Sequence, residues 1–212
     1  MTSGGTESIL LACKTYRDWG IAVKNITSPE IIVGESAHAS FDKAGHYFNI
    51  KIVKVPIDLH TGKIVVNKLK KAINSNTICI VGSAPSFSHG VMDDIEILSD
   101  IALQNNIGLH VDCCLGGFIL PFIKKIGLIN FEYDFNLKGV TSISVDPHKY
   151  GYTMKGSSII LYRSKDLRRY QYYINSKWNG GIYATPTISG SRSGVSIATT
   201  WTAFMYHGMS GY

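Results

Sequence analysis

Residues 139–151 read Gly-Val-Thr-Ser-Ile-Ser-Val-Asp-Pro-His-Lys-Tyr-Gly. The apolar, strand-like run that ends at Val145 is followed at once by the pair His148-Lys149. A bare ammonium at the carboxyl end of a buried strand is costly, because the charge loses its hydration. The position becomes reasonable if Lys149 holds an aldehyde as a Schiff base, since that bond deprotonates and consumes the amine. The alternative is an ordinary surface lysine, and three further motifs favour the first interpretation.

An acidic residue ends a second apolar run, in Gly108-Leu-His-Val-Asp-Cys-Cys-Leu-Gly-Gly117. A carboxylate at Asp112 can pair with a protonated pyridine nitrogen. That pairing keeps the ring cationic and therefore an electron sink, as pyridoxal phosphate chemistry requires. Taken alone, Asp112 is better explained as the start of a turn or the cap of the following segment.

A small-residue segment, Thr2-Ser-Gly-Gly-Thr-Glu-Ser8, leads into an apolar, helix-forming run. Free N–H groups at a helix start bind phosphate; Gly4 and Gly5 permit close approach, and Thr6 adds a hydroxyl. Capping of the helix by Ser3 or Thr6 is the plain alternative, and both readings can hold together. The nucleotide-binding pattern Gly-x-x-x-x-Gly-Lys-Ser/Thr is absent.

A histidine follows the strand-like run Glu30–Gly34, in Ser36-Ala-His-Ala-Ser40. The flat imidazole of His38 can stack on a cofactor ring in a cleft. The alternative is a structural, hydrogen-bonded histidine.

Helices and strands are predicted to alternate along the chain, which indicates an α/β fold with a mostly parallel sheet and helices on both faces. In such sheets ligands bind outside the carboxyl ends of the strands. His38, Ser83, Asp112 and Lys149 all follow predicted strands at that end, so we expect them to converge. The predicted strands span 30–34, 51–55, 77–82, 109–112, 141–145 and 158–162, the last one antiparallel, and the predicted helices span 6–23, 40–48, 66–74, 93–105, 166–174 and 197–206.

Taken in order, Gly-Gly-Thr, Ser-Ala-His, His-Val-Asp and His-Lys resemble the fold-type I, pyridoxal-phosphate-dependent enzymes of the group II decarboxylase superfamily. Within it the sequence is most similar to the sphingosine-1-phosphate lyase family, over essentially the whole chain. The segments that carry the resemblance are Thr2–Ile9, Val111–Cys113 with Leu115–Phe118, Gly139–Ser144, His148–Tyr152, Lys155–Ser158, and Gly180–Ala184 with Gly190–Arg192.

The resemblance implies roles for residues that the motifs alone do not explain. His148 is expected to bind the cofactor phosphate beside Lys149. Ser191 is expected to reach the cofactor phosphate of a neighbouring subunit, and Lys155 to contact a substrate phosphate. An ordinary turn serine and a solvated loop lysine are the respective alternatives. The complete cofactor set is then Gly5, Thr6, His38, Asp112, His148, Lys149 and Ser191.

The resemblance also implies an activity, a homodimer with shared active sites and a fatty substrate. The expected reaction is retro-aldol cleavage of the C2–C3 bond of a phosphorylated sphingoid base, giving a long-chain aldehyde and phosphoethanolamine. A decarboxylase of the same superfamily would use the same residues but would need a cation for a substrate carboxylate. A non-catalytic binding partner that keeps the fold is a second alternative, which the intact Lys149, Asp112 and His38 argue against.

Composition sets the broad class. The 212 residues are 45% hydrophobic and 17% charged, which is enough for one globular domain with a sizeable core. A net charge of +6 suits an anionic substrate or membrane surface, and no nucleic-acid recognition motif is present. The four cysteines lack the spacing of a disulfide scaffold, which predicts reduced thiols in an intracellular compartment. No metal site is expected, and no run is long enough to span a membrane.

The glycine turn lies at residue 4 with no strand before it, and the chain stops just after an apolar helix. In the resembling family an N-terminal segment and a C-terminal small domain flank this region. We therefore expect residues 1–212 to be the cofactor-binding large domain, truncated at both ends. By the same resemblance, a eukaryotic full-length protein would be anchored in the endoplasmic reticulum membrane with its catalytic domain in the cytosol.

Overall fold

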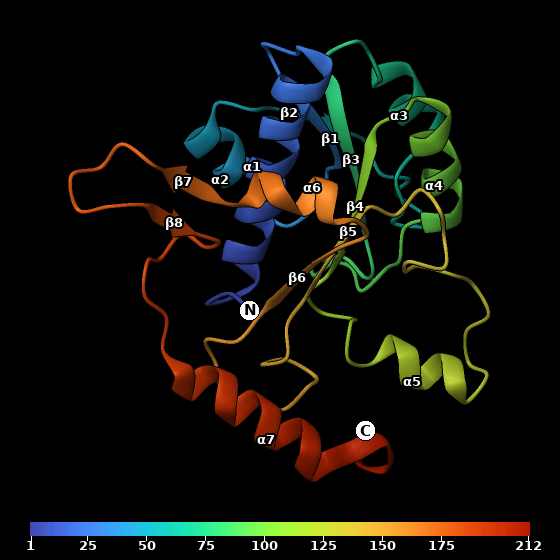
Figure 1. Ribbon diagram of the computed structural model, residues 1–212. Coiled ribbons are helices and arrows are strands. Elements are labelled where there is room, and N and C mark those ends of the chain that lie inside the picture. Colours follow the sequence, from blue (N-terminus) through green and yellow to red (C-terminus); the bar gives the residue numbers. More distant parts are fainter.

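Six strands form the central sheet of the computed structural model, which describes residues 1–212, in the order β2-β1-β3-β4-β5-β6 (Figure 1). Strands β1 to β5 run parallel to their neighbours, and β6 closes the edge antiparallel to β5, as predicted. The mostly parallel α/β sheet is thereby confirmed. The strands are β1 (Glu30–Gly34), β2 (Lys51–Val55), β3 (Thr77–Ser83), β4 (Gly108–Cys113), β5 (Ser142–Val145) and β6 (Ile159–Tyr162).

Helices cover both faces of this sheet. On one face α1 (Gly5–Lys24) packs beside α2 (Ser40–Phe48), and on the other lie α3 (Val66–Ala72) and α4 (Ile95–Gln104). The remaining elements are α5 (Leu120–Lys125), α6 (Lys165–Arg168), a 3-10 helix (Arg169–Gln171), the strands β7 (Tyr173–Asn175) and β8 (Tyr183–Thr185), which form a separate two-stranded ribbon, and α7 (Gly194–Gly211).

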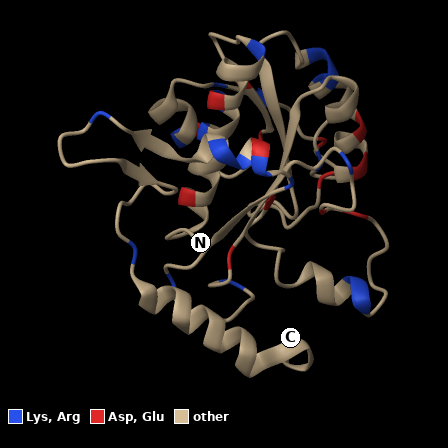
Figure 2. Cartoon of the chain, in the orientation of Figure 1, with Lys and Arg blue, Asp and Glu red and all other residues tan.

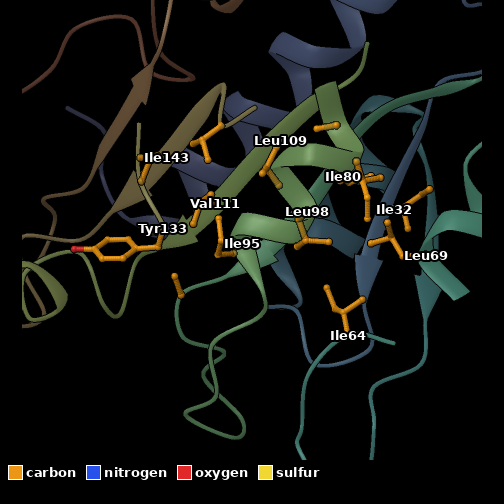
Figure 3. Close-up of a cluster of buried hydrophobic side chains, with 14 of the residues drawn as sticks. Ile32, Ile64, Leu69, Ile80, Ile95, Leu98, Leu109, Val111, Tyr133 and Ile143 are labelled. Atoms are coloured by element: carbon orange, nitrogen blue, oxygen red, sulfur yellow. The ribbon is translucent and has the colours of Figure 1, made fainter. Parts of the chain in front are cut away.

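The core divides into two layers because side chains alternate across a strand. Ile32, Leu109 and Ile143 point toward α3 and α4, where they join one buried cluster (Figure 3). Ile31 and Val33 of β1 point the other way and pack against α1 and α2. Full burial of such a side chain stabilises the fold by about 1.5–3 kcal/mol, so the two layers fix the sheet on which the strand ends are arrayed.

The helix predicted over residues 166–174 is wrong. Helix ends after Arg168, a 3-10 turn follows, and Ile174 lies in β7. The ammonium of Lys14 lies 2.6, 3.3 and 3.0 Å from the carbonyl oxygens of Tyr170, Gln171 and Tyr172. The next residues, Tyr173–Asn175, pair with β8, so the chain leaves the helix before them. Lys14 binds carbonyl groups that carry no helix hydrogen bond.

The start of α4 also differs from the helix predicted over 93–105, in which Asp93 would be the first residue and the cap. The helix begins at Ile95, and no side chain caps it. The Asp93 carboxylate instead accepts hydrogen bonds from the N–H groups of Ile64, at 3.0 Å, and Ser83, at 2.8 Å. Asp93 therefore fixes the end of β3. Helix α5 and the β7–β8 ribbon are further elements that the sequence patterns did not indicate.

No helix of the chain combines the length and the apolar character that crossing a bilayer requires.

Candidate functional site

A cleft of about 630 Å³ opens at the carboxyl ends of the parallel strands. Its walls come from the start of α1, the turn after β1, the ends of β3 and β4, and the turn after β5. Six of the eight predicted site residues line it, namely Gly5, Thr6, His38, Asp112, His148 and Lys149. The topology therefore brings together residues that lie up to 144 positions apart, as is typical of ligand sites in open α/β sheets.

Asp112 lies near the end of β4, in the middle of the sheet, and is buried. It stands in register between Ser83 of β3 and Ser144 of β5. Its Oδ1 accepts a hydrogen bond from the backbone N–H of Cys114 at 3.0 Å and one from the Ser144 hydroxyl at 3.2 Å. The carboxylate is thus held by the strand ends and presented to the cleft.

Lys149 lies in the turn that follows β5, and its ammonium is 3.1 Å from Oδ2 of Asp146. His148 Nε2 lies 3.7 Å from the same oxygen. Asp146 is 2% exposed and lines the cleft, yet it was not among the predicted site residues. Its place directly after the strand, three residues before Lys149, is the only signal in the sequence that marks it, and the pairing itself depends on how the turn closes.

Two buried polar atoms of this turn have no hydrogen-bond partner in the chain, Oδ1 of Asp146 and Nδ1 of His148. Leaving a buried polar atom unpaired costs roughly 1–3 kcal/mol. Such atoms in a native cleft call for an explanation, and a bound polar ligand is one.

The first turn of α1 faces the same cleft. The helix begins at Gly5, with Gly4 as its N-cap residue and no capping side chain. Capping by Ser3 or Thr6 is therefore wrong, and the Ser3 N–H and hydroxyl instead donate to Glu7. The N–H groups of the first turn are left for an anion, which the helix dipole also favours.

Gly5 is required for close packing here. A Cβ atom at this position would lie 2.6 Å from Oδ2 of Asp146 and 2.9 Å from Sγ of Cys114. Real Cβ atoms do not approach other atoms so closely, so the helix start and the β5 turn can meet only at a glycine.

His38 lies in the turn between β1 and α2, and its side chain is exposed at the cleft. The backbone N–H of Ser40 donates to His38 Nδ1 at 3.1 Å. The ring is therefore anchored by one nitrogen while it lines the cleft. Its stacking on a cofactor ring stays a prediction. Lys43 and Tyr47 of α2 line the same wall and were not predicted; their spacing of four residues places them on one helix face.

Ser191 and Lys155 do not line this cleft. Ser191 is exposed and borders an adjacent hollow of about 280 Å³, which shares Ser3 and Ser189 with the cleft. Lys155 is exposed in the loop between β5 and β6. The roles given to these two residues stay predictions.

The four cysteines are buried and unpaired, as the sequence predicted. Burial raises the pKa of the Cys114 thiol well above its usual value, and the neighbouring carboxylates of Asp112 and Asp146 add to that rise. Cys114 therefore stays a neutral thiol at the floor of the cleft.

Comparison with known proteins places this geometry in context. The family model described as "Pyridoxal-dependent decarboxylase conserved domain" matches residues 1–212. A sphingosine-1-phosphate lyase of Oryza sativa is 52% identical over the whole chain, which spans 39% of that relative. The solved structure of a sphingosine-1-phosphate lyase of Burkholderia pseudomallei superposes with a TM-score of 0.97 at 43% identity, over 100% of this chain and 48% of that one. A glutamate decarboxylase of Lactobacillus brevis superposes with a TM-score of 0.83 at 26% identity, over 100% of this chain and 50% of that one.

Proposed function

Because this chain belongs to the pyridoxal-dependent decarboxylase family, whose cofactor is pyridoxal phosphate, we propose that it is the cofactor-binding large domain of a carbon–carbon lyase. Its substrate would be a phosphorylated sphingoid base, which is split at the C2–C3 bond. The observation that carries the proposal is the meeting of Lys149, Asp112 and the start of α1 in one cleft, in a chain 52% identical to a lyase of that name.

The residues of the cleft fit the cofactor. The uncapped first turn of α1 and the unpaired Nδ1 of His148 offer donors to a phosphate. The amine of Lys149 is the group that would bind the cofactor aldehyde, Asp112 would pair with the ring nitrogen, and His38 would stack on the ring. When bound, pyridoxal phosphate supplies an electron sink for the pair released as a substrate bond breaks.

The protein groups would then position the reacting atoms. The carboxylate of Asp146, 3.1 Å from Lys149 Nζ, holds that amine at the cleft floor. Once the substrate amine has displaced Nζ from the aldehyde, the freed Nζ would remove the proton from the C3 hydroxyl of the substrate, which is the proton that must leave for the aldehyde product to form. A general base of this kind contributes roughly 10²- to 10⁴-fold to a rate.

Decarboxylation is the competing function, since a glutamate decarboxylase shares the fold. Both reactions use the same cofactor residues, so the products separate them. Lys155 is the proposed substrate-phosphate contact, and its exposed position in the loop after Lys149 leaves its ammonium free to meet a dianionic group.

The full-length protein is expected to cleave a phosphorylated sphingoid base and to leave the unphosphorylated base, glutamate and aromatic amino acids unreacted. Lys155→Ala should reduce the preference for the phosphorylated base by about 10- to 100-fold, the value of one charge-assisted contact, while cofactor binding changes little. The assay measures aldehyde and carbon dioxide from each substrate, with Lys125→Ala, a lysine outside the cleft, as control. Carbon dioxide without aldehyde would establish a decarboxylase instead.

A homodimer with shared sites is the second part of the proposal. Helix α7 carries no charged residue (Figure 2) and exposes Val195, Trp201 and Met205. Large exposed apolar surfaces are typical of protein contacts. Ser191 lies just before α7 and outside its own cleft, which supports the proposal that it contacts a neighbouring subunit's cofactor.

Mixing Lys149→Ala chains with Ser191→Asp chains is therefore expected to restore part of the activity, because one of the two composite sites in a mixed dimer would be intact. The carboxylate at position 191 would repel the cofactor phosphate in the opposite site. Activity is compared with that of each variant alone and of the wild type. No recovery in a mixed dimer verified by mass would argue against sharing.

Attachment to the endoplasmic reticulum membrane in a eukaryotic full-length protein stays a prediction from the family resemblance.

A further inference from the structure

A fully buried histidine lies behind the cleft and takes no part in the chemistry described above. His110 is 1% exposed and stands on β4, two residues before Asp112, so both side chains lie on the same face of the sheet. In the register of β4 with β5, His110 pairs with Ser142 as Asp112 pairs with Ser144. The pattern His-x-Asp beside Ser-x-Ser thus places four polar side chains in two adjacent rows.

These side chains form one continuous chain of hydrogen bonds that starts on α1. Tyr16 Oη lies 2.6 Å from Ser142 Oγ, and Ser142 Oγ lies 2.7 Å from His110 Nδ1. His110 Nε2 lies 3.2 Å from Ser144 Oγ, which lies 3.2 Å from Asp112 Oδ1. Tyr16 is 1% exposed, so this series of hydrogen bonds runs through the core from α1 to the cleft.

The number of protons that each group can donate fixes the direction of the two hydrogen bonds nearest the cleft. The carboxylate of Asp112 only accepts, so Ser144 donates its single hydroxyl proton to it. The Ser144 oxygen must then accept from Nε2–H of His110. Burial lowers the pKa of His110 to about 4, so near neutral pH the ring carries only that one proton.

The same count of protons fixes the direction of the two hydrogen bonds farther from the cleft. With its proton on Nε2, His110 accepts at Nδ1 from the Ser142 hydroxyl. Because Ser142 donates its one proton to His110, its oxygen can only accept from the Tyr16 phenol, which also lies 2.7 Å from Thr141 Oγ1. Every bond therefore donates toward Asp112, and the histidine has one tautomer.

The consequence for Asp112 is a fixed carboxylate. Its Oδ1 accepts both from Ser144 and from the N–H of Cys114, which prevents rotation of the carboxylate plane. Its Oδ2 is engaged by no backbone amide and no hydroxyl of the chain. Since Asp112 lines the cleft, Oδ2 is the oxygen available to a ligand.

We propose that His110 is a positioning residue: by donating through Ser144, it holds the Asp112 carboxylate in the orientation that presents Oδ2 to the cofactor ring nitrogen. This inference rests on the proposed function, because it assumes that pyridoxal phosphate is the ligand. A histidine that only filled space would leave the protonation state of the ring nitrogen unaffected.

The test uses the full-length protein loaded with pyridoxal phosphate isotopically labelled at its pyridine nitrogen. Ser144→Ala removes the donor to Asp112, His110→Leu removes both imidazole contacts, and His110→Gln keeps an N–H near the place of Nε2. The nitrogen chemical shift reports ring protonation, and a titration gives the cofactor dissociation constant. Ser99→Ala is the matched control, because this buried serine accepts a hydrogen bond from Gly139 N–H and takes no part in the network that leads to Asp112.

Ser144→Ala and His110→Leu are expected to raise the dissociation constant about 10-fold, the value of one hydrogen bond to a charged group, and to shift the ring nitrogen toward its unprotonated signal. His110→Gln should keep the wild-type signal, and Ser99→Ala should change neither readout. If His110→Leu fails to fold, His110→Asn replaces it, because its shorter side chain leaves no N–H near the place of Nε2. Unchanged signals and affinity in the folded variants would overturn the inference while the wild type still binds cofactor; a wild type that binds none would overturn the proposed function as well.

Discussion

Replacing Lys149 by alanine in the full-length protein is expected to abolish the covalent attachment of pyridoxal phosphate and nearly all turnover. The only amine at the floor of the cleft that is held by a buried carboxylate would be lost. Loss of its role as general base alone would lower the rate by roughly 10²- to 10⁴-fold, and loss of the attachment point adds to that. No other change to this chain is expected to have a larger effect.

Borohydride reduction followed by peptide mapping measures the attachment directly. The wild type should carry its label on Lys149, and the Lys149→Ala protein should carry none. Lys43→Ala is a demanding control, because Lys43 lines the same cleft from α2 but has no carboxylate partner in the chain. A label on Lys43 or on any other lysine in the wild type would refute the assignment.

Asp112→Asn is expected to retain much of the cofactor yet to lose turnover by on the order of 10²-fold or more. Asparagine has the same shape, and its carbonyl oxygen can still accept from Ser144 and from the N–H of Cys114, so the fold should persist. What disappears is the negative charge that keeps the ring nitrogen protonated, and with it the electron sink.

The measurements are steady-state turnover and cofactor content of the purified protein. Asp166→Asn, the same change at an exposed position away from the cleft, should leave both at wild-type levels. Near-normal turnover in Asp112→Asn would show that the carboxylate has no such role, even if the cofactor sits beside it.

The sequence predicted β1, α2 and β2 with their observed bounds, because local periodicity and burial agree there. It failed over residues 166–174, where the chain leaves the helix to form β7, which pairs with β8. Pairing with a strand later in the chain leaves no trace in the local hydrophobic pattern. The same reasoning explains why the cleft residues at strand ends could be foreseen, since the topology alone brings them together.

Other parts of the candidate site depended on geometry that spacing does not give. Asp146 directly follows β5, yet no motif predicts a role for it, because its pairing with Lys149 depends on how the turn after β5 closes. His110 was visible two residues before Asp112, yet its connection to Asp112 runs through Ser144 on the next strand. The order of the strands in the sheet must be known before the residues of β4 can be aligned with those of β5.

The close contact between Gly5 and Asp146 joins segments 141 residues apart in the chain. Contacts between residues so far apart in sequence form late in folding, because the entropy cost of closing the loop comes before the contact can stabilise the chain. The helix start and the lysine turn therefore meet only when the sheet between them is complete. A ligand that needs both the start of α1 and the turn after β5 therefore binds the native state and not partly folded states. By mass action such a ligand, at a hundred times its dissociation constant, would stabilise the native chain by about 2.7 kcal/mol. The supply of cofactor in the cell would then help to set how much of this protein survives.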